Sequence, residues 1–160
     1  MGKTAAVPPL ISFLAVCQAA NSPLVDTHRD ISYSNAYLNL HSHTFFELLY
    51  CRNNCGAEYL VGAERYRLQK GDIIFVPPGV SHRPLLPEDM TDAYRRDVLW
   101  ISAEFAQQLD GTLPDSNPLQ SGLLRTAGTK WEFLADLFRN GVQEAEQAAP
   151  DWELAVIGNT

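Results

Sequence analysis

Short apolar runs punctuated by turn residues occupy the first two thirds of the chain, whereas the last third has a helical period. Between residues 33 and 109, runs rich in branched and aromatic residues are separated by glycine, proline and asparagine, which is the pattern of β-strands. The strands predicted in this way are residues 36–43, 47–51, 57–61, 65–68, 73–76 and 98–102. Six or more strands at this spacing favour a β-barrel or a sandwich.

Two turns between these strands can be predicted from residue type. Gly62-Ala63 predicts a two-residue hairpin turn, because glycine readily takes a positive φ at the first central position. Pro77, Pro78 and Gly79 cannot continue a regular ladder, so they predict a sharp corner after a buried strand. His82 is therefore expected just beyond that corner.

The residues after Ser102 have helical patterns. Ser102 is the predicted cap of a short helix, and residues 110–117 are polar and contain turn residues, which predicts a loop. The apolar positions of one longer amphipathic helix are Trp131, Leu134, Leu137, Phe138, Val142 and Ala145. A second helix is predicted to begin near Pro150. Because its pattern is still periodic at Thr160, we expect the natural protein to continue further.

Composition favours one soluble globular domain that does not bind DNA by itself. The chain has 160 residues, of which 46% are hydrophobic, enough for a packed core. Its 12 basic residues stand against 19 acidic ones, and a net charge of -7 repels phosphate backbones. The basic pairs, Arg65 with Arg67 and Arg95 with Arg96, are interpreted as solvated surface.

Residues 1–30 are expected to form an N-terminal arm. Residues 10–20 are interpreted as a short helix or arm that packs on the barrel, with a secretory signal as the alternative. Residues 26–30 predict a polar loop with His28 at the surface. No run approaches the roughly 20 apolar residues of a membrane span, so no membrane partner is expected.

The cysteines favour a reducing compartment. Cys17, Cys51 and Cys55 are an odd number, so at least one thiol is unpaired, which suits the cytoplasm. Cys51 and Cys55 have neither a zinc-ribbon spacing nor that of a redox motif, and a thiol inside a strand is interpreted as a small hydrophobic residue.

Three histidines and one carboxylate form the candidate site. In a strand His41 and His43 leave the same face about 6.6 Å apart, so their imidazoles can converge on one point. Glu47 can join them only if the chain bends between residues 44 and 46, since in a straight strand it lies about 20 Å from His41. His82, just beyond the corner at residues 77–79, is the fourth member of the set. Such a set suits a divalent ion (Zn, Ni, Mn or Fe). The alternative is a pocket for a polar organic ligand without any metal.

Two runs of the chain resemble the paired motifs of the cupin superfamily. Residues 41–47 match His-x-His-x-x-x-Glu, and residues 71–82 match Gly-x5-Pro-x-Gly-x-x-His. The chain differs from the motifs in having eight residues between Glu47 and Gly56 and in lacking an asparagine near Leu86. The resemblance implies a mainly β fold, a cupin-like antiparallel β-barrel (double-stranded β-helix) that binds a metal or a small ligand inside.

A narrower resemblance extends over most of residues 25–160. Together with the run at 94–105, Tyr-Arg-Arg-Asp-Val-Leu-Trp-Ile-Ser-Ala-Glu-Phe, the two motifs resemble the N-terminal sensing domain of AraC-type transcription regulators. This implies an arm at 1–30, a barrel at 31–109, and a loop with helices at 110–160 that pair two subunits. It also implies a DNA-binding domain of two helix-turn-helix units that is not in this chain.

We therefore expect a ligand-sensing, dimerising regulatory domain in the cytoplasm and not an enzyme. A small-molecule effector would bind in the barrel beside His41, His43, Glu47 and His82, and DNA would be bound only through the missing domain. Sugars, urea and aromatic acids all remain open as effectors. The alternative is a stand-alone metal-dependent cupin enzyme, such as a dioxygenase or a sugar isomerase.

Aromatic residues complete the predicted pocket and the predicted subunit contact. Candidate pocket walls lie in or next to the predicted strands: Tyr37, Phe45, Tyr50, Tyr59 and Trp100. The candidate dimer helix offers Trp131, Leu134, Leu137 and Phe138. The simpler alternative for this helix is that its apolar stripe covers the barrel of its own subunit.

Overall fold

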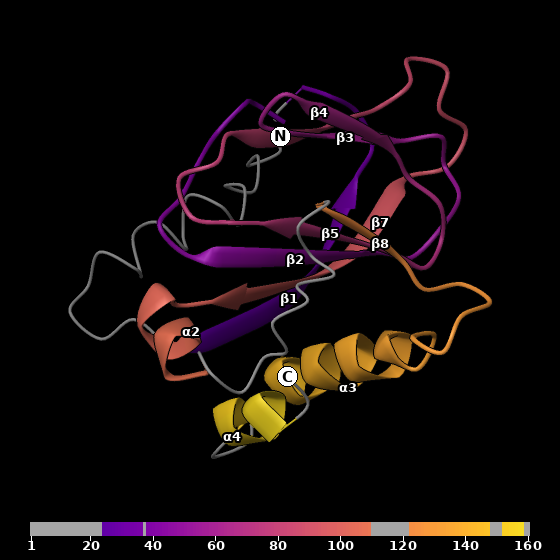
Figure 1. Ribbon diagram of the computed structural model, residues 1–160. Helices are drawn as coiled ribbons and strands as arrows, with labels where there is room; N and C mark the ends of the chain where they lie inside the picture. The colour runs from indigo at the N-terminus through magenta and orange to yellow at the C-terminus, as the bar shows by residue number, and fades with distance from the viewer. Residues whose placement is uncertain (1–23, 37, 110–121, 148–151, 159–160) are drawn as a thin grey trace, which may run out of the picture.

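The computed structural model describes residues 24–36, 38–109, 122–147 and 152–158, whose strands form two antiparallel sheets that face each other (Figure 1). The larger sheet has the order β1 (Val25–Ser32), β7 (Tyr94–Ile101), β2 (Phe46–Cys51), β5 (Asp72–Val76) and β8 (Leu123–Arg125). The smaller sheet has the order β4 (Glu64–Arg67), β3 (Glu58–Val61) and β6 (His82–Leu85). The helices are α2 (Ala103–Leu109), α3 (Leu134–Gln147) and α4 (Trp152–Gly158). The expected antiparallel β fold followed by C-terminal helices is confirmed.

Strand β7 lies between β1 and β2 in the large sheet. Its side chains point alternately to the inner and the outer face of that sheet. Tyr94, Arg96, Val98 and Trp100 are all buried and share one face, because successive strand residues point to opposite faces. On this face Tyr94, Val98 and Trp100 join a core cluster to which the small sheet contributes Tyr59. The barrel interior therefore lies between the two sheets.

The outer face of the large sheet is covered by α3 and α4 (Figure 1). Phe138 of α3 stacks on Tyr50 of β2 with 5.5 Å between ring centroids, and Val142 is fully buried. Val156 of α4 packs with Val25 of β1 in a second cluster. The apolar stripe of α3 thus covers a sheet of its own subunit, which was the simpler alternative to a contact with a second subunit. Trp131 and Phe133, which precede α3, remain exposed.

Several local predictions agree closely with the structure. The strands expected at 47–51, 57–61, 65–68 and 73–76 match β2, β3, β4 and β5 within one residue. Gly62 has a φ of 58° in the two-residue turn between β3 and β4. Ser102 caps α2 as expected, since its Oγ accepts a hydrogen bond from the backbone N–H of Phe105 at 3.1 Å.

The prediction of a polar loop at 26–30 is wrong, because these residues belong to β1, which pairs with β7 along eight residues. Three of the polar side chains there bond to β7. Thr27 donates to the carbonyl of Val98, Arg29 pairs with the buried Asp97, and Asp30 pairs with Arg96. A polar sequence can therefore form a buried strand when the neighbouring strand supplies the complementary groups.

The strand predicted at 36–43 is also wrong in the described residues. Only His41 is bridged there, to His82, and Tyr37 lies outside the described part of the chain. The segment is held by the amide of Asn35, which donates to the carbonyl of Leu86 at 2.7 Å and accepts from the N–H of Leu86 at 2.9 Å. A side chain here replaces the backbone ladder that the sequence pattern suggests.

Three further differences concern element boundaries. The strand expected at 98–102 begins earlier, at Tyr94, and the helix expected from Trp131 begins at Leu134 after a turn. Strands β6 and β8 were not predicted, because β6 contains a proline and β8 has only three residues. The expected arm at 10–20, the loop at 110–117 and the helix start at Pro150 lie outside the described residues.

In the part of the chain that the structure describes, no helix has the length and hydrophobicity needed to span a membrane.

Truncating the inward face of α3 should destabilise the domain. We expect Phe138→Ala to lower the free energy of unfolding by about 3 kcal/mol, because it removes a buried ring and leaves a cavity against Tyr50. Phe133→Ala is the matched control: its ring is 52% exposed, so the expected loss is under about 1 kcal/mol. Urea unfolding measures both, and equal losses would contradict this packing of α3.

Candidate functional site

Three buried side chains converge between the sheets. His43 precedes β2, Glu47 lies in β2, and His82 opens β6; the three offer ligand atoms that all lie within 4.8 Å of one another. Nε2 of His82 is 3.1 Å from Oε2 of Glu47, and Nε2 of His43 is 3.6 Å from the same oxygen. The large and the small sheet therefore meet at one carboxylate oxygen.

The backbone fixes the orientation of these imidazoles. Nδ1 of His43 lies 2.8 Å from the carbonyl of Phe45, and Nδ1 of His82 lies 2.9 Å from the carbonyl of Val80. A carbonyl can only accept a hydrogen bond, so Nδ1 carries the proton in both rings. In the neutral imidazole Nε2 then presents a lone pair toward Glu47.

A bend at residues 44–45 brings His43 and Glu47 together. The carbonyl of His43 accepts a hydrogen bond from the N–H of Gly79 at 2.7 Å, so the corner after β5 holds the chain just before β2. The ring of His43 turns back and stacks on Phe45, with centroids 3.8 Å apart. The expected bend is thus made by contacts with the rest of the fold and needs neither glycine nor proline.

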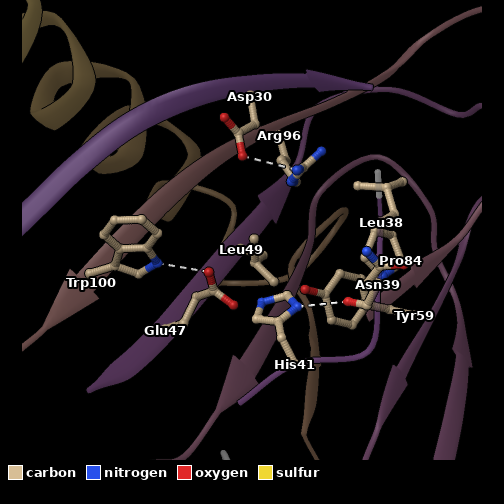
Figure 2. A pocket seen from close by; sticks show the side chains of 10 residues that line it. All are labelled: Asp30, Leu38, Asn39, His41, Glu47, Leu49, Tyr59, Pro84, Arg96 and Trp100. Atoms are coloured by element: carbon tan, nitrogen blue, oxygen red, sulfur yellow. Dashed lines mark hydrogen bonds and ion pairs between the residues drawn. The ribbon is translucent and has the colours of Figure 1, made fainter. Parts of the chain in front are cut away.

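Glu47 remains ionised although it is buried. Burial raises the pKa of Glu47, but hydrogen bonds from His43 and His82, in the form in which their Nε2 atoms carry a proton, and from the indole N–H of Trp100 favour the carboxylate and hold that pKa well below its ordinary value. The Trp100 Nε1–H donates to Oε1 of Glu47 at 2.7 Å (Figure 2). Each carboxylate oxygen therefore has a separate environment, with Trp100 at Oε1 and the imidazoles at Oε2.

The residues present fit a divalent metal ion. Nε2 of His43, Nε2 of His82 and Oε2 of Glu47 are buried, and the described residues offer none of the three a hydrogen-bond partner. Two lone pairs and a carboxylate oxygen repel one another unless a cation lies between them. A metal ion satisfies all three, and an additional proton on an imidazole is the alternative.

His41 stands apart from this group of three. Its backbone N–H and carbonyl both bond to His82, at 3.2 and 2.9 Å, and its Nδ1 lies 2.9 Å from the carbonyl of Asn39. Burial lowers the pKa of His41 below its ordinary value, which favours the neutral ring. The structure therefore brings together three of the four expected ligands, and His41 lines the neighbouring cavity instead.

That cavity has a volume of about 30 Å³, room for about two water molecules, and Glu47 is among the residues that line it (Figure 2). Its lining residues are Asp30, Leu38, Asn39, His41, Glu47, Leu49, Tyr59, Pro84, Arg96 and Trp100. Both sheets contribute to it, through β1, β2 and β7 on one side and β3 and β6 on the other.

The predicted aromatic walls have four different outcomes. Tyr59 and Trp100 line the cavity, whereas Phe45 is buried in the core beside His43. Tyr50 does not line the cavity, contrary to the expectation, because it points to the other side of β2 and packs on Phe138. Tyr37 lies outside the described residues.

Arg96 and Asp30 were missed as site residues, and Arg96 is not the solvated residue that the sequence suggested. Its side chain is buried: one terminal nitrogen donates to Asp30 Oδ2 at 2.9 Å and the other to Ser32 Oγ at 3.0 Å. The guanidinium also lies over the ring of Tyr94, 5.0 Å from its centroid. The available signal was the alternation of β7, in which Arg96 shares a face with Tyr94, Val98 and Trp100.

Removal of the indole N–H that binds Glu47 should destabilise the domain, because the buried carboxylate then lacks this hydrogen bond. We expect Trp100→Phe to lower the free energy of unfolding by about 2 kcal/mol, because a buried, charged acceptor loses its hydrogen bond. Trp152→Phe in α4 is the control for the change of ring, and we expect a loss below about 1 kcal/mol. Urea unfolding without added metal is the measurement; equal effects would mean that the hydrogen bond to Glu47 adds no stability.

Several solved structures resemble this chain. A cupin 2 conserved barrel domain protein from Salinispora arenicola CNS-205 is 18% identical, with a TM-score of 0.43 over 60% of this chain and 77% of that one. An RmlC-like cupin from Shewanella frigidimarina NCIMB 400 is 19% identical, with a TM-score of 0.44 over 52% of this chain and 70% of that one. A salicylate 1,2-dioxygenase variant from Pseudoaminobacter salicylatoxidans, in complex with gentisate, is 15% identical, with a TM-score of 0.49 over 83% and 45%.

The search of curated proteins found no match. A family model, described as the AraC-like ligand binding domain, matches residues 24–155, which include both sheets, the buried His43, Glu47 and His82, and the cavity beside them. The chain therefore belongs to the family of AraC-like ligand-binding domains.

Proposed function

We propose that this chain is the ligand-sensing domain of an AraC-type transcription regulator and that its effector binds in the cavity between the sheets. The observation that carries this proposal is a polar cavity, lined by Asp30, Arg96, Tyr59 and Glu47, inside a domain of this family. An interior site with a few placed polar groups among apolar walls is typical of small-molecule binding.

The packing around the cavity supports a route from ligand to output. Trp100 lines the cavity and contacts His28 of β1, with ring centroids 4.5 Å apart. Asp30 of β1 is bound to Arg96 of β7, and α3 packs on these same two strands from outside. A ligand that prefers one arrangement of β1 and β7 would shift the population of α3 positions by its difference in affinity.

A divalent metal ion is part of the proposal. His43, Glu47 and His82 would hold it, and the ion would supply a Lewis-acidic position for an oxygen of the ligand beside the cavity. The protein's own contribution is to keep both Nδ1–H groups bound to backbone carbonyls, so that both Nε2 atoms face the ion.

The remaining parts of the regulator follow from charge and surface. A net charge of -7 does not suit DNA, so DNA contacts would come from a segment beyond this chain, in the cytoplasm. A second subunit would use the apolar side chains that α3 and α4 leave exposed, of which Trp131, Phe133 and Leu154 are examples. Leu134 and Phe138 would contribute less to pairing than expected, because they pack on their own sheet.

A metal-dependent enzyme is the second candidate. The observation in its favour is the group of three buried, unsatisfied ligand atoms, because a purely structural cluster would have its lone pairs satisfied. Catalysis would in addition need an open coordination position and a substrate-sized cavity.

Metal content tests the buried cluster. In protein purified without nickel resin we expect about one equivalent of a first-row ion by elemental analysis, and we expect His82→Ala to lose most of it, since two ligands bind far more weakly than three. His28→Ala is the matched control, because His28 lies outside the group of three. Less than a tenth of an equivalent in the wild-type protein would favour the alternative without metal.

The regulatory proposal is tested on the full-length gene product. Its reading frame should continue past Thr160 into a basic segment with two helix-turn-helix patterns. Its retention on DNA from its own promoter should change with one compound class among sugars, ureas and carboxylic acids, because effector binding shifts the subunit arrangement. A frame that ends within a few codons, together with turnover of a compound by the metal-loaded protein, would replace the regulator by the enzyme.

A further inference from the structure

The guanidinium of Arg96 is buried at the cavity with most of its hydrogen-bonding capacity unused by the described residues. Its side chain is 6% exposed, and it lines the cavity (Figure 2). Of its five N–H groups, two make the hydrogen bonds that the structure records within the described part of the chain, to Asp30 and to Ser32. The remaining donors are fixed in position by these two contacts.

A second donor reaches the same cavity. The side chain of Tyr59 lines it, and burial raises the pKa of its hydroxyl far above the ordinary value, so the hydroxyl keeps its proton. Among the described residues the structure records no hydrogen bond from this hydroxyl. Two carboxylate oxygens of the cavity are engaged, since Asp30 accepts from Arg96 and Oε1 of Glu47 accepts from Trp100, while Oε2 of Glu47 faces the imidazoles of His43 and His82. A ligand therefore meets donors first.

The charge of the site depends on the metal. One guanidinium and two carboxylates, Asp30 and Glu47, leave the lining with one net negative charge. A proton on His82 would bring this sum to zero, whereas a divalent ion beside Glu47 would make it positive by one. An anion is thus repelled or tolerated without metal and attracted with it.

The size of the cavity suits a small acidic group. About 30 Å³ holds about two water molecules, which is close to the size of a carboxylate group. Planar, bidentate recognition of a carboxylate is the task for which the guanidinium fork is best suited.

We propose that the effector is a small carboxylate, whose acid group is bound by Arg96 and Tyr59 when a divalent ion occupies the site formed by His43, Glu47 and His82. This inference rests on the proposed function, since it names the ligand class of the same cavity. Asp30 and Ser32 act as positioning residues, because both belong to β1 and accept hydrogen bonds from the guanidinium. A carboxylate that binds Arg96 is therefore connected to β1 through these two contacts.

The test uses glycolate as the probe and ethylene glycol as its neutral analogue, titrated calorimetrically into the zinc-loaded protein. We expect glycolate to bind more tightly than ethylene glycol by on the order of tenfold to a hundredfold, the value of a hydrogen bond to a charged group. We also expect chelation of the zinc to remove this preference for the acid.

The test variant is Arg96→Met combined with Asp30→Asn, because removal of the arginine alone would leave a buried carboxylate unpaired. It should keep its zinc and lose the preference for glycolate. Arg96→Lys, which keeps the charge without the fork, should retain part of it. Arg95→Met is the matched control: Arg95 is the next residue of β7, points to the opposite face and pairs with the exposed Asp92, so glycolate binding should not change.

Equal binding of glycolate and ethylene glycol by the zinc-loaded protein would overturn the carboxylate proposal, as would undetectable binding of glycolate. Unchanged glycolate binding in the double variant would also overturn the proposal. If the double variant does not fold, unchanged glycolate binding in Arg96→Lys would do the same. These results can be told apart from a failure of the proposed function. If a sugar or a urea alters DNA retention and glycolate does not bind, the regulatory proposal holds and the carboxylate proposal fails. If glycolate binds at Arg96 and no compound alters DNA retention, the carboxylate site holds and the regulatory proposal fails.

Discussion

The Glu47 carboxylate is the group on which the interior of this domain depends. A buried negative charge is costly unless it is paired and hydrogen-bonded. The two oxygens of Glu47 contact different parts of the fold. Oε1 is bound by Trp100 of β7, and Oε2 faces His43 and His82, which come from opposite sides of the barrel. Anything that alters this carboxylate therefore acts on the contact between the two sheets as well as on the site.

Strand β7 connects the interior with the outer face of the sheet. Its inward residues, Arg96 and Trp100, line the cavity, while Asp97 is buried on the other face between Arg29 and Arg52, with N–O distances of 2.9 and 3.5 Å. Both faces of the strand thus hold charged groups in fixed pairs. The strand is therefore held by polar contacts on both faces as well as by its backbone ladders to β1 and β2.

Local patterns predicted β2, β3, β4 and β5 within one residue, and the sequence motifs named the three side chains that the structure brings together, His43, Glu47 and His82, along with His41, which lines the cavity. Long-range partners account for what was missed. The bend that brings Glu47 to His43 is held by the N–H of Gly79, far along the chain. Arg95 and Arg96 look equivalent in sequence, and only the partner of each, Asp92 at the surface or Asp30 in the interior, decides which one is buried. A single sequence does not reveal such partners, because they are separated by up to 66 positions.

The attachment of the segment before His41 decides what the cavity wall is made of. Two hydrogen bonds between the amide of Asn35 and the backbone of Leu86 hold this segment beside β6, where a strand would need a full ladder. The backbone of His41 bonds to His82 at the other end of the segment. Leu38 and Asn39, which lie between these two attachments, form part of the cavity wall. Part of that wall is therefore positioned by the small sheet without belonging to a strand.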